Sequence, residues 1–220
     1  MLLKIENFGG HFHCKSKHNT SFVTVDRFNA TFESGVTVLR GDIDSAGWAL
    51  CYALNFATAD KDSFIDEDTA VYLDGTRYAL EAFSKRAGYI DLYGYDSRKD
   101  DRMAVRQHIE RALCESDLNF TVDDIKNAFQ LTDSRFQCPL TENGNEALRA
   151  IAAIEFAKGK DVFCFPWLSA KMLCYYAEHI ETICDFLDRQ GKIALLPTSY
   201  VNQIGNWRVL DLSDTHVFGA

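Results

Sequence analysis

The chain has 220 residues, of which 47% are hydrophobic and 25% are charged, and these values are ordinary for a soluble globular protein. The length suits one α/β domain with a full core, or at most two small domains. The net charge of -9 argues against a nucleic-acid binder, because that class gains most of its affinity from basic side chains that neutralise phosphates.

Apolar runs and cysteines give a first expectation for where the protein is located. No stretch approaches the roughly 18 apolar residues of a membrane-spanning helix, and the first residues lack the long apolar region of a signal peptide. The seven cysteines are odd in number and form no CxxC pair, which is typical of free thiols in a reducing compartment. We therefore expect a cytoplasmic protein without direct membrane insertion, which meets a membrane only through a partner.

Hydrophobic alternation predicts a strand at 1–6, a polar loop at 11–20 and a second strand at 22–32. A short run rich in β-branched residues predicts a buried strand at 36–39, which a polar loop joins to a buried helix at 48–56. The rest of the chain alternates between predicted strands (71–73, 89–93, 162–165, 193–196 and 208–212) and predicted helices (103–114, 122–129, 146–157 and 169–190). This alternation favours a parallel sheet flanked by helices, to which the opening strands add an antiparallel part.

The loop GDIDSAG at 41–47 carries the strongest functional signal, because it joins a buried strand directly to an apolar helix. A phosphate-binding loop lies in this context, where backbone N–H groups and the helix N-terminus form an anion site, and its usual form is GxxxxGK[ST]. The alternative is an ordinary strand-to-helix turn with Asp44 or Ser45 as N-cap. The candidate nucleotide-binding residues in this loop are Gly41, Asp44, Ser45, Ala46, Gly47 and Trp48.

Six segments in order resemble the ATP-binding cassette (ABC) ATPases. FNATFESGVTVLRGDIDSAGWALCYAL is similar to the opening of the family, VYLDG to the strand after its first helix, and GYIDLYG to the start of its Gln loop. VRQHIERAL resembles the start of the helical subdomain, NGNEALRAIAAIEFAKGKDVFCFPWLSA the signature motif and Walker B strand, and KIALLPTSY the last core strand and switch loop. The resemblance implies one P-loop NTPase-like domain over 1–220, of class α/β, with a mixed sheet, flanking helices, a helical subdomain at about 95–155, and ATP as a possible cofactor.

Most positions that handle phosphate or metal in this family carry other residues here. Gly47 stands where the family has Lys and Trp48 where it has Ser or Thr, and a shift of one residue brings Trp48 and Ala49 there instead. The Gln-loop position is Leu92, the Asp-Glu pair after the Walker B strand is replaced by Pro and Trp167, and the switch His is replaced by Ser199. Since these side chains supply neither an ammonium, a magnesium ligand nor a general base, we predict no catalytic residues and no efficient ATP hydrolysis.

The departures leave three hypotheses for the function. The first is a degenerate cassette that is a structural or regulatory subunit and binds a protein partner, which is a copy of itself, an active ABC ATPase or a membrane permease. The second is a nucleotide-binding enzyme with unusual ligands, in which Asp42, Asp44 and Asp91 bind metal and Arg40 meets phosphate. The third is a binding module that uses the emptied nucleotide cleft, and a cleft filled by Trp48 and Trp167 would argue against it.

The signature motif retains the most of its pattern, since Asn143, Gly144, Glu146 and Arg149 keep part of the S-G-x-E-x-x-R spacing. In the family this element faces the nucleotide of the opposite subunit, so the resemblance implies a partner-facing role. The alternative is a capping box in which Asn143 caps the following helix and Glu146 is its third residue. The surface of the last long helix, with Tyr175 and Tyr176, is predicted to be ordinary helix surface.

The polar loop predicted at 11–20 contains His11, His13, Cys14 and His18, which are ligand types that zinc prefers. The alternative, a solvated loop without metal, is the prediction adopted here. The resemblance implies that an aromatic residue in this region stacks on adenine, and Phe12 or Phe22 is the candidate.

Overall fold

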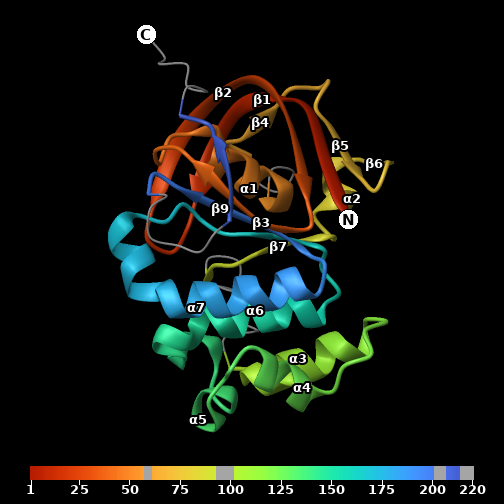
Figure 1. The fold of residues 1–220 in the computed structure, drawn as a ribbon, viewed down its shortest axis with the longest axis vertical. Helices are drawn as coiled ribbons and strands as arrows, with labels where there is room; N and C mark the ends of the chain where they lie inside the picture. The colour runs from red at the N-terminus through yellow and green to blue at the C-terminus, as the bar shows by residue number, and fades with distance from the viewer. Residues whose placement is uncertain (57–60, 93–101, 201–206, 214–220) are drawn as a thin grey trace.

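The computed structural model describes residues 1–56, 61–92, 102–200 and 207–213. The end of the strand predicted at 89–93, the end of the GYIDLYG segment and the start of the subdomain predicted near 95 lie outside these residues. Figure 1 shows the layers from top to bottom: an antiparallel sheet, a central helix, a parallel sheet, a pair of long helices and a group of short helices.

The antiparallel sheet is built on two long strands, β1 (Leu2–Lys15) and β2 (Thr20–Glu33). Its order is β2-β1-β5-β6, and the short strand β4 also pairs with β1. The added strands are β4 (Phe64–Ile65), β5 (Ala70–Leu73) and β6 (Thr76–Tyr78). The loop predicted at 11–20 is wrong in its first part, because β1 continues through it to Lys15 and turns alternate residues into the core.

The second sheet is parallel and confirms most of the predicted strands. Its order is β10-β3-β9-β8-β7, and all four described pairings are parallel. Its strands are β3 (Gly35–Arg40), β7 (Ala87–Tyr89), β8 (Val162–Cys164), β9 (Ile193–Thr198) and β10 (Arg208–Asp211). The central strands are buried on both faces, which explains why their sequences are continuous apolar runs.

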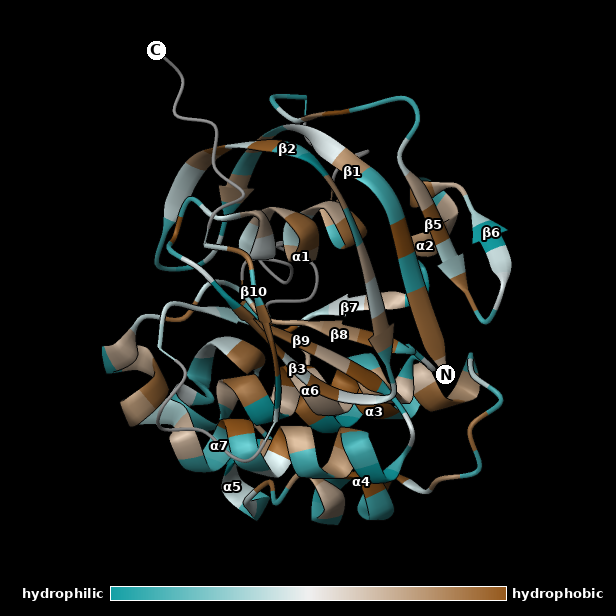
Figure 2. Cartoon of the chain, turned by 45° about the horizontal axis from the view of Figure 1, so that its top comes forward, coloured by the Kyte–Doolittle hydropathy of each residue, from teal (hydrophilic) through white to brown (hydrophobic). Residues whose placement is uncertain are grey.

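Helices fill both faces of the parallel sheet. α1 (Ala46–Phe56) lies between the two sheets, and all but its last two residues are buried, as expected for a helix that is apolar on every side. α6 (Ala147–Ala157) and α7 (Ala170–Arg189) cover the opposite face, and Figure 2 shows both helices on that side of the sheet.

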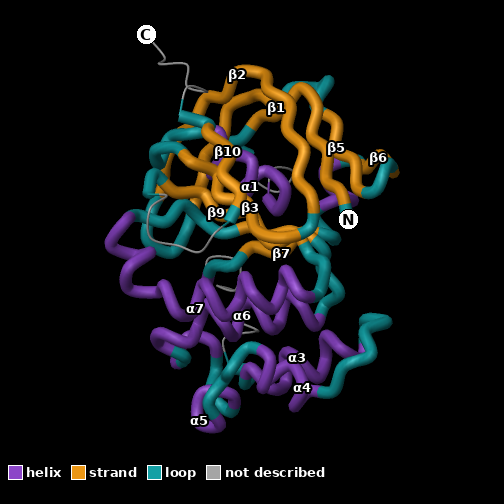
Figure 3. Tube along the Cα trace, in the orientation of Figure 1, coloured by secondary structure: helices purple, strands orange, loops and turns teal. Residues whose placement is uncertain are grey.

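The remaining helices are short and lie mainly below α6, as Figure 3 shows. They are α3 (Val105–Cys114), α4 (Val122–Ala128) and α5 (Asp133–Phe136), followed by two 3-10 turns, η2 (Leu140–Glu142) and η3 (Gly144–Glu146). α2 (Leu80–Phe83) lies near β5. Consecutive residues of β9 face different cores: Ile193 and Leu195 pack with α1, whereas Ala194 and Leu196 pack with α6 and α7. The parallel sheet therefore separates two apolar cores and places the loop at 41–47 at the end of β3.

None of the described helices is both long and apolar enough to cross a membrane.

Candidate functional site

The loop at 41–47 is hydrogen-bonded to the end of β9 and forms a tight turn. The backbone N–H of Gly41 donates to the Thr198 carbonyl at 3.0 Å, and the N–H of Ser45 donates to the Asp42 carbonyl at 2.9 Å. A Cβ added to Gly41 would lie only 2.5 Å from the Cβ of Ser45, so this approach requires glycine. Ser45 is fully buried, and its hydroxyl has no hydrogen-bond partner within the described part of the chain.

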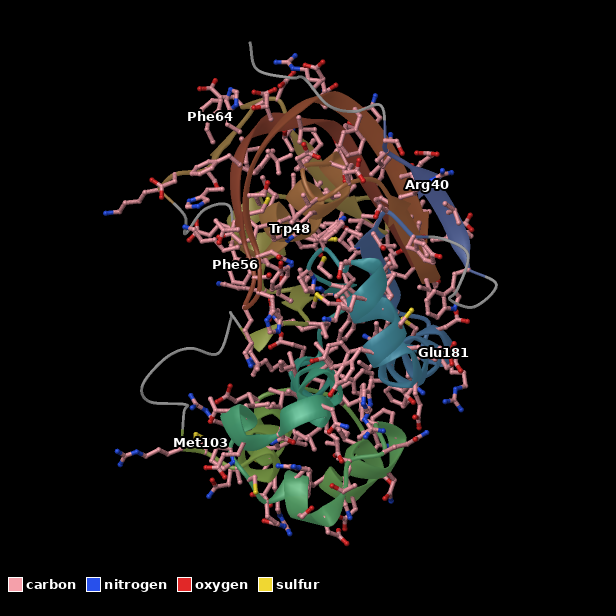
Figure 4. The ribbon with its side chains drawn as sticks, turned by 90° about the vertical axis from the view of Figure 1, so that its left-hand side faces the viewer. Arg40, Trp48, Phe56, Phe64, Met103 and Glu181 are labelled. Atoms are coloured by element: carbon pink, nitrogen blue, oxygen red, sulfur yellow. The ribbon has the colours of Figure 1, made fainter. Side chains whose placement is uncertain are left out.

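Trp48 is part of the core between the two sheets. Its side chain is 0% exposed, and its indole N–H donates to the Tyr89 hydroxyl at 2.9 Å. The Tyr89 hydroxyl in turn donates to the Lys15 carbonyl at 3.3 Å, and burial raises the pKa of this phenol well above its usual value, so the donor stays protonated. Figure 4 shows Trp48 in the interior of the molecule. The indole therefore packs α1 between β7 and β1.

Trp167 spans from the end of β8 to the start of the loop. Its indole N–H donates to the Gly41 carbonyl at 3.1 Å, and its partly buried ring packs against the same core as α1. Cys164, Phe165 and Leu168 around it are fully buried, so the run CFPWLS is core apart from Trp167 and Ser169, which are half-buried. Trp167, which the resemblance matches to the family's glutamate, thus contacts the loop itself, and this contact argues against an emptied cleft between them.

The hydroxyl of Thr198 connects the end of β9 to the segment that follows β8. Thr198 is fully buried, and its hydroxyl donates to the Leu168 carbonyl at 2.8 Å while it accepts the backbone N–H of Tyr200 at 3.1 Å. Ser199, which the resemblance matches to the switch His, is exposed. The sequence pattern indicated neither the Thr198 contact nor the Trp167 contact, because both depend on how three separate strand ends meet.

The charged residues near the loop do not converge on it. Arg40 forms an ion pair with Asp211 at 3.3 Å, and Figure 4 shows it at the outer surface. Asp91 is only 5% exposed, and its carboxylate accepts the backbone N–H of Lys17 at 2.8 Å. The described residues contain no group of three or more His, Cys, Asp or Glu side chains placed to hold a metal ion. A metal site made of Asp42, Asp44 and Asp91 therefore has no support in the described part of the chain.

The histidine-rich segment is strand, and its alternation separates the proposed ligands. Cys14 points into the core, whereas His11 contacts the Thr24 hydroxyl at 2.9 Å and His13 stacks on Phe22 with ring centroids 4.2 Å apart. The same alternation buries Phe12, which is 1% exposed and stacks on another core ring. This corrects the expectation that the Phe12 ring is free for a nucleotide base. Phe22 is 74% exposed.

The signature-like residues form a buried connection between α5 and α6. Glu146 accepts the backbone N–H and the hydroxyl of Thr132, each at 3.0 Å, and Arg149 lies 3.8 Å from its carboxylate. Asn143 is fully buried and donates its side-chain amide to the Pro139 carbonyl at 2.9 Å. The predicted capping box is wrong, because Thr132 already binds the Glu146 carboxylate and the Asn143 side chain makes no cap hydrogen bond. Of the four candidate residues only Gly144 is exposed, with φ at 58°, so a partner-facing role stays a prediction.

No protein-family profile matches the sequence, and no curated protein matches it. Solved structures do. An ABC transporter candidate (ATP-binding protein) from Pyrococcus furiosus is 11% identical, with a TM-score of 0.66, and the match covers 99% of this chain and 100% of that protein. MJ1267, an ATP-binding cassette of an ABC transporter in its ADP conformation, is 10% identical with a TM-score of 0.63, covering 96% of this chain and 87% of that one.

The cassette MJ0796, solved as a dimer in a post-hydrolysis state with ADP and phosphate, is 11% identical with a TM-score of 0.59, covering 98% of this chain and 96% of that one. At this level of identity the likeness concerns the fold alone. The chain has the fold of an ATP-binding cassette, with mixed strand directions and flanking helices.

Proposed function

We propose that this chain is a cassette-fold subunit that does not hydrolyse ATP and that acts as a structural or regulatory partner of another protein. The observation that carries the proposal is a pair of tryptophans on either side of the loop at 41–47. One, Trp48, lies at the start of α1, and the other, Trp167, follows β8. Trp48 is locked in the core by Tyr89, and Trp167 is hydrogen-bonded to Gly41. Neither indole supplies the hydroxyl or the carboxylates that hold Mg²⁺ and orient the attacking water in phosphoryl transfer.

The proposal includes the organisation of the molecule. We take residues 1–220 as one cassette domain and assign the helices within about 95–155, including α3, α4 and α5, to its helical subdomain. The protein would be cytoplasmic and would reach a membrane through its partner, which is a second copy, an active cassette or a permease. A similar solved cassette is a dimer, which supports a protein partner of this general kind.

The test is a paired measurement of nucleotide binding and turnover on the purified chain. Isothermal titration calorimetry with MgATP and ADP measures binding, and a phosphate-release assay measures hydrolysis. We expect no turnover above the rate in the absence of protein. Rapid Mg²⁺-dependent phosphate release would overturn the proposal. Cooperative urea unfolding of the same sample shows that the absence of turnover belongs to folded protein.

Binding without hydrolysis is a second candidate function, and Ser45 favours it. Its buried hydroxyl has no partner among the described residues and stands immediately before α1, whose N-terminal N–H groups favour anions. Micromolar MgATP binding that is weakened by Ser45→Ala would support a subunit that senses nucleotide. MgATP binding that is unchanged by Ser45→Ala, Arg40→Ala and Asp44→Asn would contradict nucleotide binding at this loop.

A further inference from the structure

A shallow apolar groove crosses the first turns of α7, far along the sequence from the loop at 41–47. Its lining residues are His18, Lys171, Met172, Cys174, Tyr175 and Tyr176, which together we name the α7 groove, and its volume is about 720 Å³. His18 comes from the tip of the β1–β2 hairpin, which lies beside the start of α7 in Figure 1. Tyr175 is 68% exposed and packs edge-to-face on Tyr176 with ring centroids 4.7 Å apart. Tyr176 itself is half-buried, so Tyr175 is the exposed ring of the pair. A large exposed aromatic ring over an apolar groove is typical of a contact surface rather than of ordinary helix surface.

The charged side chain in the described lining of the groove, that of Lys171, is opposite in sign to the net charge of the chain, and the exposed Glu178 lies about one turn beyond Tyr175 along α7. The net charge of the protein is -9, yet no carboxylate is among the residues that line the α7 groove. Lys171 lies on its rim and Lys17 precedes His18 at the hairpin tip, and all three side chains are exposed. A local basic rim on an acidic protein attracts an acidic partner and disfavours a basic one.

A smaller pocket extends the groove towards the interior. It shares His18, Met172 and Tyr176 with the α7 groove and reaches Leu148 of α6 and Leu92 after β7. The one carboxylate that lines it, that of Asp91, accepts the Lys17 backbone N–H and is 5% exposed. The pocket has a volume of only about 40 Å³ and a mixed polar and apolar lining, so it has room for no more than the end of an apolar side chain that lies in the groove.

We infer that the α7 groove is the docking site for an acidic amphipathic segment of a partner protein, with apolar anchor side chains on the groove floor and Asp or Glu side chains against Lys17, His18 and Lys171. Aromatic floor residues supply most of the binding energy in contacts of this kind, while rim charges select the partner and its orientation. The inference rests on the proposed function in one respect, since it names the surface through which a non-hydrolysing subunit would act.

The experiment uses the purified full chain and fluorescence anisotropy of a labelled helical peptide with Leu and Phe on one face and Glu elsewhere. A matched peptide carries Lys in place of every Glu. We expect the acidic peptide to bind at low salt and to weaken at high salt, and the basic peptide not to bind. Lys171→Glu and Tyr175→Ser should each weaken binding by about tenfold. Both residues are exposed, and a glutamate in the first turn of α7 suits the helix dipole, so neither change should unfold the protein.

Arg111→Glu on α3 is the matched control, because it makes the same charge change on an exposed side chain of another helix. It should leave peptide binding unchanged. No binding, equal binding of both peptides, or binding unaffected by Lys171→Glu and Tyr175→Ser would overturn the inference. So would self-association in sedimentation equilibrium that Tyr175→Ser abolishes, since the occupant would then be a second copy. Phosphate release from the same sample tests the proposed function separately, so either idea can fail without the other.

Discussion

At the scale of single residues, the site is defined by two indoles that find hydrogen-bond acceptors inside the protein. A buried tryptophan N–H without an acceptor costs free energy, and here Tyr89 and the Gly41 carbonyl satisfy the two donors. Trp48 thereby connects α1 to β7 and, through Tyr89, to the end of β1. Trp48, which the resemblance to the ABC ATPases would match to a magnesium-binding hydroxyl, thus packs the core of this chain.

The first prediction concerns this connection. Trp48→Phe should lower the free energy of unfolding by about 1–3 kcal/mol, because it removes the indole N–H and part of a buried ring. Urea unfolding measures the loss. Tyr89→Phe should also destabilise the protein, since the Trp48 N–H then has no acceptor. The double variant should cost less than the sum of the two single variants. Strict additivity would contradict a direct interaction between the two side chains.

At the scale of elements, the segment between α5 and α6 shows how one carboxylate can join two helices. Glu146 binds the backbone and side chain of Thr132 at the start of α5 and lies near Arg149 of α6. Thr132 lies 14 residues before Glu146 and Arg149 lies three residues after it, so the arrangement differs from a capping box. The segment is therefore an internal brace, which leaves Gly144 at the surface above it.

The second prediction tests this brace. Glu146→Ala should lower the free energy of unfolding by about 1–3 kcal/mol, because Thr132 and Arg149 lose a buried partner. Glu146→Gln should cost less, since its amide oxygen still accepts from Thr132. Thermal or urea unfolding compares the two variants. Glu142→Ala, at an exposed position on the preceding turn, is the control and should change stability by less than about 0.5 kcal/mol. Equal losses for Glu142→Ala and Glu146→Ala would speak against the brace.

Local patterns predicted the existence and order of the elements well. A strand that is buried on both faces, or a helix that is buried on all sides, needs a continuous apolar run, and the parallel strands and α1 have such runs. They failed where polar residues occur in strands. His11 and His13 lie on the outer face of β1, so a strand with a solvated face was interpreted as a loop. They also failed where a side chain could bind either of two groups. The Glu146 carboxylate binds Thr132 instead of forming the predicted capping box with Asn143. The contacts of Trp167 with Gly41 and of Lys17 with Asp91 join distant segments, and no local pattern encodes them.

At the scale of the whole molecule, the parallel sheet divides the interior into two apolar cores that contain four of the cysteines. Cys14, Cys51 and Cys164 belong to the core around α1, and Cys184 to the core under α6 and α7. Burial raises the pKa of the Cys51 and Cys184 thiols well above their usual value, so the reactive thiolate is scarce. Cys114 and Cys174 are exposed.

The third prediction follows from this distribution. In the native protein, Ellman's reagent should modify Cys114 and Cys174 first and Cys138 more slowly, since Cys138 is half-buried. The four buried thiols should react only as fast as the cores open. Mass spectrometry of digested protein identifies the modified sites, and all seven thiols should react in denaturant. Fast native labelling of Cys51 or Cys184 would be incompatible with this packing.

The burial of Trp48 has a consequence for any attempt to give such a protein hydrolytic activity. Replacing an indole of this kind by a small hydroxyl residue removes about 3–5 kcal/mol, whereas a whole domain is stable by only about 5–15 kcal/mol. Trp48→Ser alone would therefore threaten the fold before it supplied any ligand for magnesium. Under the proposed function, a single substitution would not supply hydrolysis: a small hydroxyl residue at position 48 would be tolerated only after Tyr89 and its neighbours had been repacked around it.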